Sequence, residues 1–260
     1  ELKKHIYNFC VLQPFQGKTS YLAFPQMGTT MAFYSHSNIQ THHNHVVITK
    51  SKEPNVQVLL LGKYTLPLQL TYTHYTPEVS INFTPTGLNH FFKDNTATIA
   101  KNLMQLIAQE NWIALTKRVF NQKNNDFKMQ VLEDFLLENL IKKELSLVEQ
   151  FIGISNKNPA LTVSQIADQL HVSTKTINRR FTNYVGCSPS DFKKIARFRK
   201  AINFKFNKPD SNLTQVCFEA SFYDSPHFTK ELKKLTNFAP KDFFSSIENI
   251  AESKIPYKFL

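Results

Sequence analysis

Glycine, cysteine and long apolar runs are scarce in this chain, and each scarcity excludes a class of protein. The 260 residues include only 6 Gly, which leaves little material for a loop that cradles a nucleotide phosphate. The 3 Cys form no CxxC pair, so we expect neither a disulfide framework nor a zinc finger. No apolar run approaches the ~20 residues that span a bilayer, and the start does not resemble a signal peptide. These features favour a cytoplasmic protein that does not enter a membrane.

Motifs for catalysis are missing as well. The sequence contains no nucleophile elbow, HExxH or phosphate loop, so we expect no enzymatic activity and no cofactor. The only concentrated set of potential metal ligands is His36, His42, His43 and His45, within SHSNIQTHHNH. Imidazoles on a β-barrel can bind zinc or iron. A solvated polar hairpin tip is the favoured alternative because no Asp or Glu lies among these histidines, so we expect no metal.

Positive charge is in excess and unevenly distributed. The formal net charge is +11 and the sequence pI is about 9.5, which makes an acidic polymer a plausible partner. Residues 155–260 hold 17 Lys and Arg against 9 Asp and Glu, whereas residues 1–154 hold 14 against 11. The clearest linker is Asn156-Lys157-Asn158-Pro159. We therefore expect two domains, 1–154 and 159–250, with the basic excess mainly in the second.

The first part of the chain is predicted to be β-rich. Short runs rich in β-branched and aromatic residues alternate with turn formers; these runs are 7–12, 21–24, 30–34, 45–49, 56–61, 68–72 and 79–83. Short strands at close spacing indicate a small antiparallel β-barrel or sandwich. Its aromatic side chains either fill the core or line a pocket for a small effector. The residues of that candidate pocket are Tyr21, Phe24, Phe33, Tyr34, Tyr64 and Tyr72.

Helices follow the strands. One is expected from Thr96 through Ile107, and others over 112–120, 127–143 and 147–154. The 127–143 helix carries an apolar stripe made of Val131, Leu132, Phe135, Leu136 and Leu140. This stripe either packs onto the chain's own barrel or forms a homodimer face. The sequence does not choose between these alternatives.

The segment Leu161–Gly186, LTVSQIADQLHVSTKTINRRFTNYVG, reads as two short helices with a tight turn between them. Thr162 is a natural N-cap, and Gln165 three residues later can complete a capping box. Ser173 is a second good N-cap, and it precedes a helix with exposed Lys, Asn and Arg. This layout is typical of a DNA-reading helix-turn-helix.

The pattern recurs about fifty residues later. After a long helix from Pro189 to about Phe206, the segment Leu213–Asn237 repeats the two short helices, with Thr214 and Asp224 as the expected caps. The joining helix would be ~27 Å long at 1.5 Å per residue, which can place two reading helices in successive major grooves. The whole chain is therefore expected to be α+β, with an all-α C-terminal domain of two helix-turn-helix units joined by a linker helix.

Residues 159–247 resemble the DNA-binding domain of the AraC/XylS family of bacterial transcription regulators. The matching segments are IADQLHVSTKTINRRF, GCSPSDFKKIARFRKA and SFYDSPHFTKELKKLTNFAPKDF. The chain departs from the family at Ser221, where Gly is typical, and at Leu232, where Phe is frequent; both changes are expected to loosen or reorient the second unit. The resemblance implies a promoter-binding regulator, often an activator that contacts RNA polymerase. It also implies an N-terminal domain that senses a ligand or dimerises.

Two sets of residues are predicted to contact DNA. Base readers have polar side chains on one face of a reading helix; they are Lys175, Asn178 and Arg179 in the first unit and Ser225, Thr229 and Lys230 in the second. Phosphate contacts position the protein without reading sequence; they are assigned to Thr174, Arg180, Lys193, Lys194, Arg197, Lys233 and Lys234. The competing hypothesis is a metal-binding or small-molecule-binding barrel protein or enzyme that is tethered to DNA.

Overall fold

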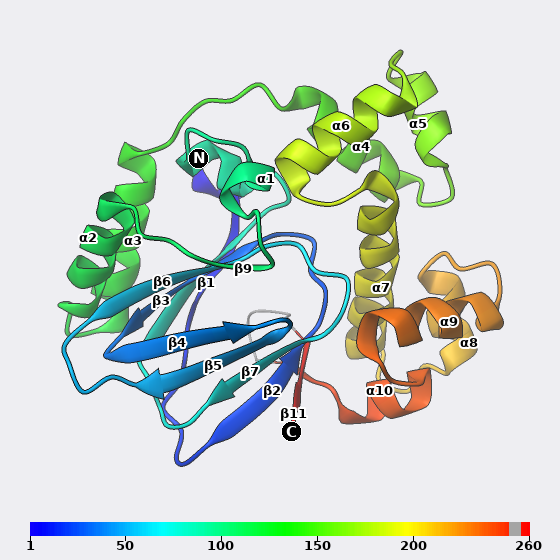
Figure 1. The fold of residues 1–260 in the computed structure, drawn as a ribbon. Coiled ribbons are helices and arrows are strands. Elements are labelled where there is room, and N and C mark those ends of the chain that lie inside the picture. Colours follow the sequence, from blue (N-terminus) through cyan, green and yellow to red (C-terminus); the bar gives the residue numbers. More distant parts are fainter. Residues whose placement is uncertain (250–255) are drawn as a thin grey trace.

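Two β-sheets build the N-terminal part of the computed structural model, which describes residues 1–249 and 256–260 (Figure 1). The first sheet has the order β1-β8-β3-β6-β9 and the second β10-β11-β2-β7-β5-β4. All strand pairs are antiparallel except β5 and β7, which run parallel. The strands are β1 (Ile6–Val11), β2 (Thr19–Ala23), β3 (Thr30–Ser35), β4 (Ser37–His42), β5 (His45–Lys50), β6 (Val56–Leu61), β7 (Leu68–Tyr72), β8 (Glu78–Phe83), β9 (Met104–Leu106), β10 (Glu248–Asn249) and β11 (Pro256–Phe259). The α+β class is confirmed, as two open sheets and a separate group of helices.

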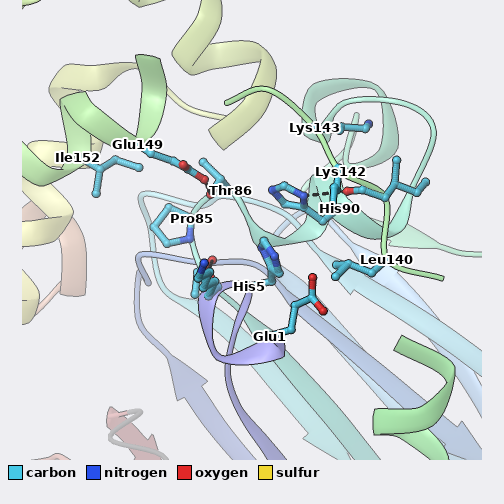
Figure 2. A pocket seen from close by; sticks show the side chains of 13 residues that line it. Glu1, His5, Pro85, Thr86, His90, Leu140, Lys142, Lys143, Glu149 and Ile152 are labelled. Atoms are coloured by element: carbon cyan, nitrogen blue, oxygen red, sulfur yellow. Dashed lines mark hydrogen bonds between the residues drawn. The ribbon is translucent and has the colours of Figure 1, made fainter. Parts of the chain in front are cut away.

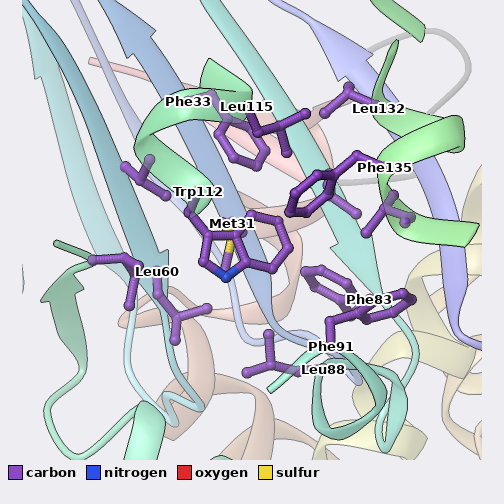
Figure 3. Packing of buried hydrophobic residues seen from close by; sticks show 14 of the residues in the cluster. Met31, Phe33, Leu60, Phe83, Leu88, Phe91, Trp112, Leu115, Leu132 and Phe135 are labelled. Carbon is purple, nitrogen blue, oxygen red and sulfur yellow. The ribbon is translucent and has the colours of Figure 1, made fainter. Parts of the chain in front are cut away.

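Two helices cover the first sheet and close its core. They are α2 (Glu110–Phe120) and α3 (Asn125–Glu138). Trp112 of α2 is fully buried, and its ring lies 6.1 Å from Phe33, 5.2 Å from Phe92 and 5.1 Å from Phe135 (Figure 3). The apolar stripe of α3 is therefore used within the chain: Leu132, Phe135 and Leu136 belong to this core. The first alternative for the stripe, packing on the chain's own sheet, is what the structure shows.

Three expected elements differ in extent. The segment expected as a polar hairpin tip contains the strand β4, whose residues alternate between buried and exposed at Ser37–Gln40 because they pair with β5. The helix expected from Thr96 to Ile107 is only α1 (Thr96–Ile99). Its continuation forms β9, which pairs with the otherwise free edge of β6. Helix α3 ends at Glu138, and beyond it the backbone N–H of Ile141 donates to the carbonyl of His90 at 2.8 Å in the 3-10 helix η2 (Gly87–Phe91).

The remaining helices form the C-terminal part, and their ends follow local capping chemistry. They are α4 (Ser146–Lys157), α5 (Val163–Gln169), α6 (Thr174–Val185), α7 (Pro189–Asn207), α8 (Leu213–Glu219), α9 (Ser225–Thr236) and α10 (Pro240–Ser246). Thr162 and Gln165 form the expected capping box, and Ser173 and Asp224 cap α6 and α9 as predicted. The expectation for Thr214 was wrong: Asn212 caps α8, because its side chain accepts from the backbone N–H of Gln215 at 2.9 Å.

Helix α7 belongs to two cores at once. Phe192, near its start, packs with the buried side chains of α4, α5 and α6. Ile195, Phe198 and Ile202 pack instead with α8, α9 and α10. The first unit (α5 and α6) and the second unit (α8 and α9) thus lie at opposite ends of one rigid helix (Figure 1). Most of helix α4 falls within the predicted first domain (1–154), but its buried side chains pack in the core of the first unit.

The sheets and the helical part are docked through buried contacts. The amide of Asn89 is fully buried; its nitrogen donates to the carbonyl of Tyr184 in α6 at 2.8 Å. Lys63 donates to the carbonyls of Gln26, Met27 and Gly28, and its ammonium lies 6.0 Å from the ring of Phe192. Burial lowers the pKa of Lys63 to about 8.

Phe24 gives the docking an apolar component. It comes from the end of β2, is fully buried, and lies edge-on to Phe243 of α10 with 4.9 Å between ring centroids. The sheet region therefore contacts the first unit directly, and it joins the core of the second unit beside α10. None of the described helices is both long and apolar enough to cross a membrane.

The C-terminal end of the chain returns to the sheets, which the sequence did not predict. Strand β11 follows the helical part and pairs antiparallel with β2, and the backbone N–H of Leu260 donates to the carbonyl of Ser20 at 2.9 Å. Lys258 lies 3.8 Å from the ring centroid of Phe238, between α9 and α10. The predicted end of the second domain, Ile250, lies outside the described residues.

Deleting residues 256–260 is expected to uncover the edge of β2. The ladder with β11 protects that edge, so amide exchange across Thr19–Ala23 should become several-fold faster. Hydrogen-exchange mass spectrometry measures this, and β6, which lies in the other sheet, serves as the internal control. Unchanged exchange in β2 would show that the tail does not stabilise the sheet.

Candidate nucleic-acid interface

Helix α6 presents a polar face to solvent at its N-terminal half. Lys175, Asn178 and Arg179 are spaced i, i+3 and i+4, so they share this face. With Thr182 they line a shallow hollow of about 590 Å³. Ile177 and Phe181 on the opposite face are buried and anchor the helix. The structure thus brings the three predicted base readers of the first unit together.

The three side chains differ in how free they are to bind. Lys175 and Arg179 are exposed and make no hydrogen bond or ion pair with the described residues. The amide of Asn178 donates to the carbonyl of Thr174 at 2.8 Å, within its own helix. Reading an adenine would require Asn178 to exchange this local bond for the base edge. Arg179 needs no such exchange.

The second unit presents a shorter polar set. Ser225, Thr229 and Lys230 are all exposed on α9. Ser221 in the preceding turn has a φ of 62°, the left-handed conformation in which glycine is favoured. Leu232 is 2 % exposed and fills the core. The two departures from the family pattern therefore leave the second unit folded with its reading helix on the surface.

The predicted phosphate contacts fall into two groups. Four are exposed on the reading helices: Thr174, Arg180, Lys233 and Lys234. Lys234 also lies 3.6 Å from the carboxylate of Glu231. The other three lie on α7 and have partners within the protein: Lys194 pairs with Asp191 at 3.0 Å, Lys193 donates to the carbonyl of Pro159 at 3.0 Å, and the Arg197 guanidinium lies 4.8 Å from the ring centroid of Phe222.

Lys193 and Arg197 also line a hollow of about 320 Å³ between α7 and the sheet region, with Lys200, Tyr7 and Met27. The phosphate roles of Lys193 and Arg197 stay predictions. To bind DNA, these two side chains would have to move out of the hollow. The hollow is strongly basic because one face of α7 supplies its cations. Lys193 and Arg197 were predicted to contact DNA, since spacing alone does not show which face of the helix a neighbouring domain covers.

The residues of the candidate effector pocket are distributed over three cores. Phe33 packs under Trp112, and Phe24 packs against Phe243. Tyr34, Tyr64 and Tyr72 belong to the core of the second sheet, with Tyr21 packed against it. The structure therefore brings four of the six residues together and separates the two phenylalanines from them. A pocket formed by the six is a prediction that this packing does not favour.

An acidic residue that sequence reasoning missed sits among these tyrosines. The hydroxyl of Tyr72 donates to the carboxylate of Glu78, and burial raises the pKa of Glu78 to about 7. A glutamate in an otherwise alternating strand carries no distinctive sequence signal.

Two of the four clustered histidines have hydrogen-bond partners: His45 Nε2 lies 2.9 Å from Thr71 Oγ1 of β7, and His36 Nδ1 lies 2.8 Å from Ser35 Oγ. Within residues 1–249 and 256–260, no group of three or more His, Cys, Asp or Glu is arranged to hold a metal ion.

A further hollow of about 620 Å³ lies between the chain start, η2 and α4 (Figure 2). The rings of His5 and His90 meet there at 4.0 Å, and His90 Nδ1 donates to the carbonyl of Ile141 at 2.9 Å. Burial lowers the pKa of His5 to about 4, so this histidine is neutral at pH 7. The contact holds the linker before α4 against the sheet region.

Comparison with known proteins agrees with the geometry of two units on one helix. A family model described as a helix-turn-helix domain matches residues 166–246. The chain carries an AraC/XylS-type helix-turn-helix domain.

This AraC/XylS-type domain is similar to curated activators. The HTH-type transcriptional activator RhaS of Escherichia coli is 26% identical over 77 residues, which are 30% of this chain and 27% of RhaS. RhaS of Salmonella arizonae matches to the same extent. The chain thus spans about a quarter of the length of these relatives.

The whole fold has a counterpart as well. A structure of ToxT from Vibrio cholerae covers 92% of this chain and 98% of its own length, with a TM-score of 0.50 and 13% identity. The shared feature is the two-part fold, a β-rich part followed by a helical part.

The pKa of Glu78 predicts a pH dependence of stability. Because its folded pKa of about 7 lies above the ordinary glutamate value, the folded state holds its proton more tightly. The contribution is complete below about pH 4.5 and is lost as pH rises through 7. Urea unfolding at pH 5 and pH 8 should therefore show a larger loss of stability for the wild type than for Glu78→Gln. Equal losses in the two proteins would contradict the assignment.

Proposed function

We propose that this protein is a sequence-specific DNA-binding transcription regulator whose two units enter successive major grooves of a promoter. The observation that carries the proposal is the placement of α6 and α9 at opposite ends of α7 (Figure 1). At 19 residues, α7 is about 28 Å long at 1.5 Å per residue. That length is close to one turn of B-DNA, roughly 34 Å, which is the spacing of two grooves on one face.

The two units contribute differently to this function. Arg179 can bind the O6 and N7 of guanine with two hydrogen bonds, and Asn178 can bind adenine in the same way. The second unit offers two hydroxyls and Lys230, with Lys233 one turn further on for the backbone. We therefore assign base reading mainly to the first unit and anchoring mainly to the second.

Control is assigned to the sheet region, because its residues contact the helical part on both sides of α7: Asn89 meets α6, and Phe24 meets α10, which shares a core with α8 and α9. A change in the sheets would reach α6 directly and α9 through this shared core. An anionic effector would meet the cations Arg197 and Lys200 in the hollow beside α7. This arrangement favours a transcription regulator over the competing hypothesis, a metal-binding barrel tethered to DNA. We propose that the regulator has no enzymatic activity and acts in the cytoplasm, where DNA is available.

The sign of regulation and the protein partners follow from the relatives by analogy. The RhaS proteins are named transcriptional activators, so we propose activation and a contact with RNA polymerase. A homodimer would need a surface other than the buried stripe of α3; the exposed Phe127 and Leu137 on that helix are the apolar side chains available for it.

Arg179→Ala and Lys233→Ala form a matched pair of tests. The first should lower affinity for a selected promoter by about 5- to 150-fold, because a bidentate base contact contributes ~1–3 kcal/mol of discrimination, with much less effect on random DNA. The second should lower the affinity for both DNAs alike, and it should reduce the slope of log affinity against log salt concentration by about one. Fluorescence anisotropy at several salt concentrations measures both effects.

Equal losses for Arg179→Ala on the two DNAs would refute base reading by this residue. A sequence-selective loss for Lys233→Ala would refute its phosphate role.

A further inference from the structure

The turn of the second unit is one residue longer than that of the first. In the first unit the N–H of Val172 donates to the carbonyl of Ala167 at 3.1 Å, and the N-cap Ser173 follows directly. In the second unit the same bond joins Phe222 to Cys217 at 3.1 Å, but the N-cap is Asp224. Tyr223 is the residue gained between these two landmarks.

Both neighbours of Tyr223 are fixed. Phe222 is buried and packs against Phe228 with 5.2 Å between ring centroids. The carboxylate of Asp224 accepts from the N–H of His227 at 2.7 Å. The backbone at Tyr223 is therefore held at both sides, and little conformational entropy remains to be lost there on binding.

The side chain of Tyr223 nevertheless points into solvent. It is 91 % exposed, the largest exposed fraction among the large apolar side chains of the described residues. It stands immediately before the N-cap of α9, at the end of the reading helix that approaches the base edges in helix-turn-helix proteins. An exposed tyrosine on a rigid turn supplies a large contact area at a low cost in conformational entropy.

Resting on the proposed function, we propose that Tyr223 is a base-contacting residue whose ring packs against the 5-methyl group of a thymine in the major groove. The methyl group of thymine is the apolar group that base pairs present there, so an aromatic ring that reaches the bases has this one partner. Lys233 is exposed on the same helix and is the residue predicted to contact phosphate. Tyr223 would add an apolar base contact to the polar ones predicted for Ser225, Thr229 and Lys230.

The test uses the full chain and a duplex obtained by binding-site selection. Tyr223→Ala should lower affinity for this duplex about 5- to 20-fold, whereas Tyr223→Phe, which keeps the ring, should stay within about twofold. Phe218→Ala is the matched control, because Phe218 is 62 % exposed but lies on α8, the first helix of the unit. It should bind like the wild type.

Replacing thymines one at a time with deoxyuridine, which lacks the methyl group, identifies the contact. The wild type should lose affinity at one position under the second unit, and Tyr223→Ala should be indifferent to that replacement. Equal binding by wild type and Tyr223→Ala, or an equal loss in Tyr223→Phe, would overturn the proposal. If the wild type selects no sequence at all, the proposed function fails together with this inference. If it selects a sequence but does not depend on Tyr223, only this inference fails.

Discussion

Helix α7 carries one apolar stripe whose two ends belong to different cores. Phe192 is needed by the first unit and Phe198 by the second, so neither unit can rotate about the helix without opening a buried contact. Interiors packed at crystal-like density do not deform gradually. The separation and angle of the two reading helices are therefore properties of α7, and the DNA geometry that the protein can match follows from them.

The sheet region adds a second constraint to this frame. Its contacts reach α6 through Asn89 and α10 through Phe24, and the tail strand β11 returns the far end of the chain to β2. A docked sheet region can thus hold both units in one arrangement. Regulation then needs only a state in which these contacts are broken or shifted, because a ligand that binds the two states unequally changes their populations.

Much of the helical part follows from local chemistry and could be predicted. The capping box at Thr162 and the caps at Ser173 and Asp224 depend on residues three positions apart, which the sequence displays directly. The cap of α8 was misplaced by two residues, and the larger errors arose where distant strands decide the conformation: β9 forms because β6 offers a free edge. The tail strand, the half-buried Glu78 and the covered face of α7 depend on tertiary packing in the same way. The extra residue in the second turn, Tyr223, is defined by the equivalent hydrogen bonds of the two turns, which the sequence does not display.

Hydroxyl-radical footprinting of the full chain on a selected promoter tests the central claim most directly. Two units on one rigid helix predict two protected clusters on one face of the duplex, with centres about 10 base pairs apart. The cluster under the first unit should require Arg179, and the other should persist in its absence at reduced salt. A single protected cluster, or two on opposite faces of the DNA, would contradict a two-groove reader built on α7.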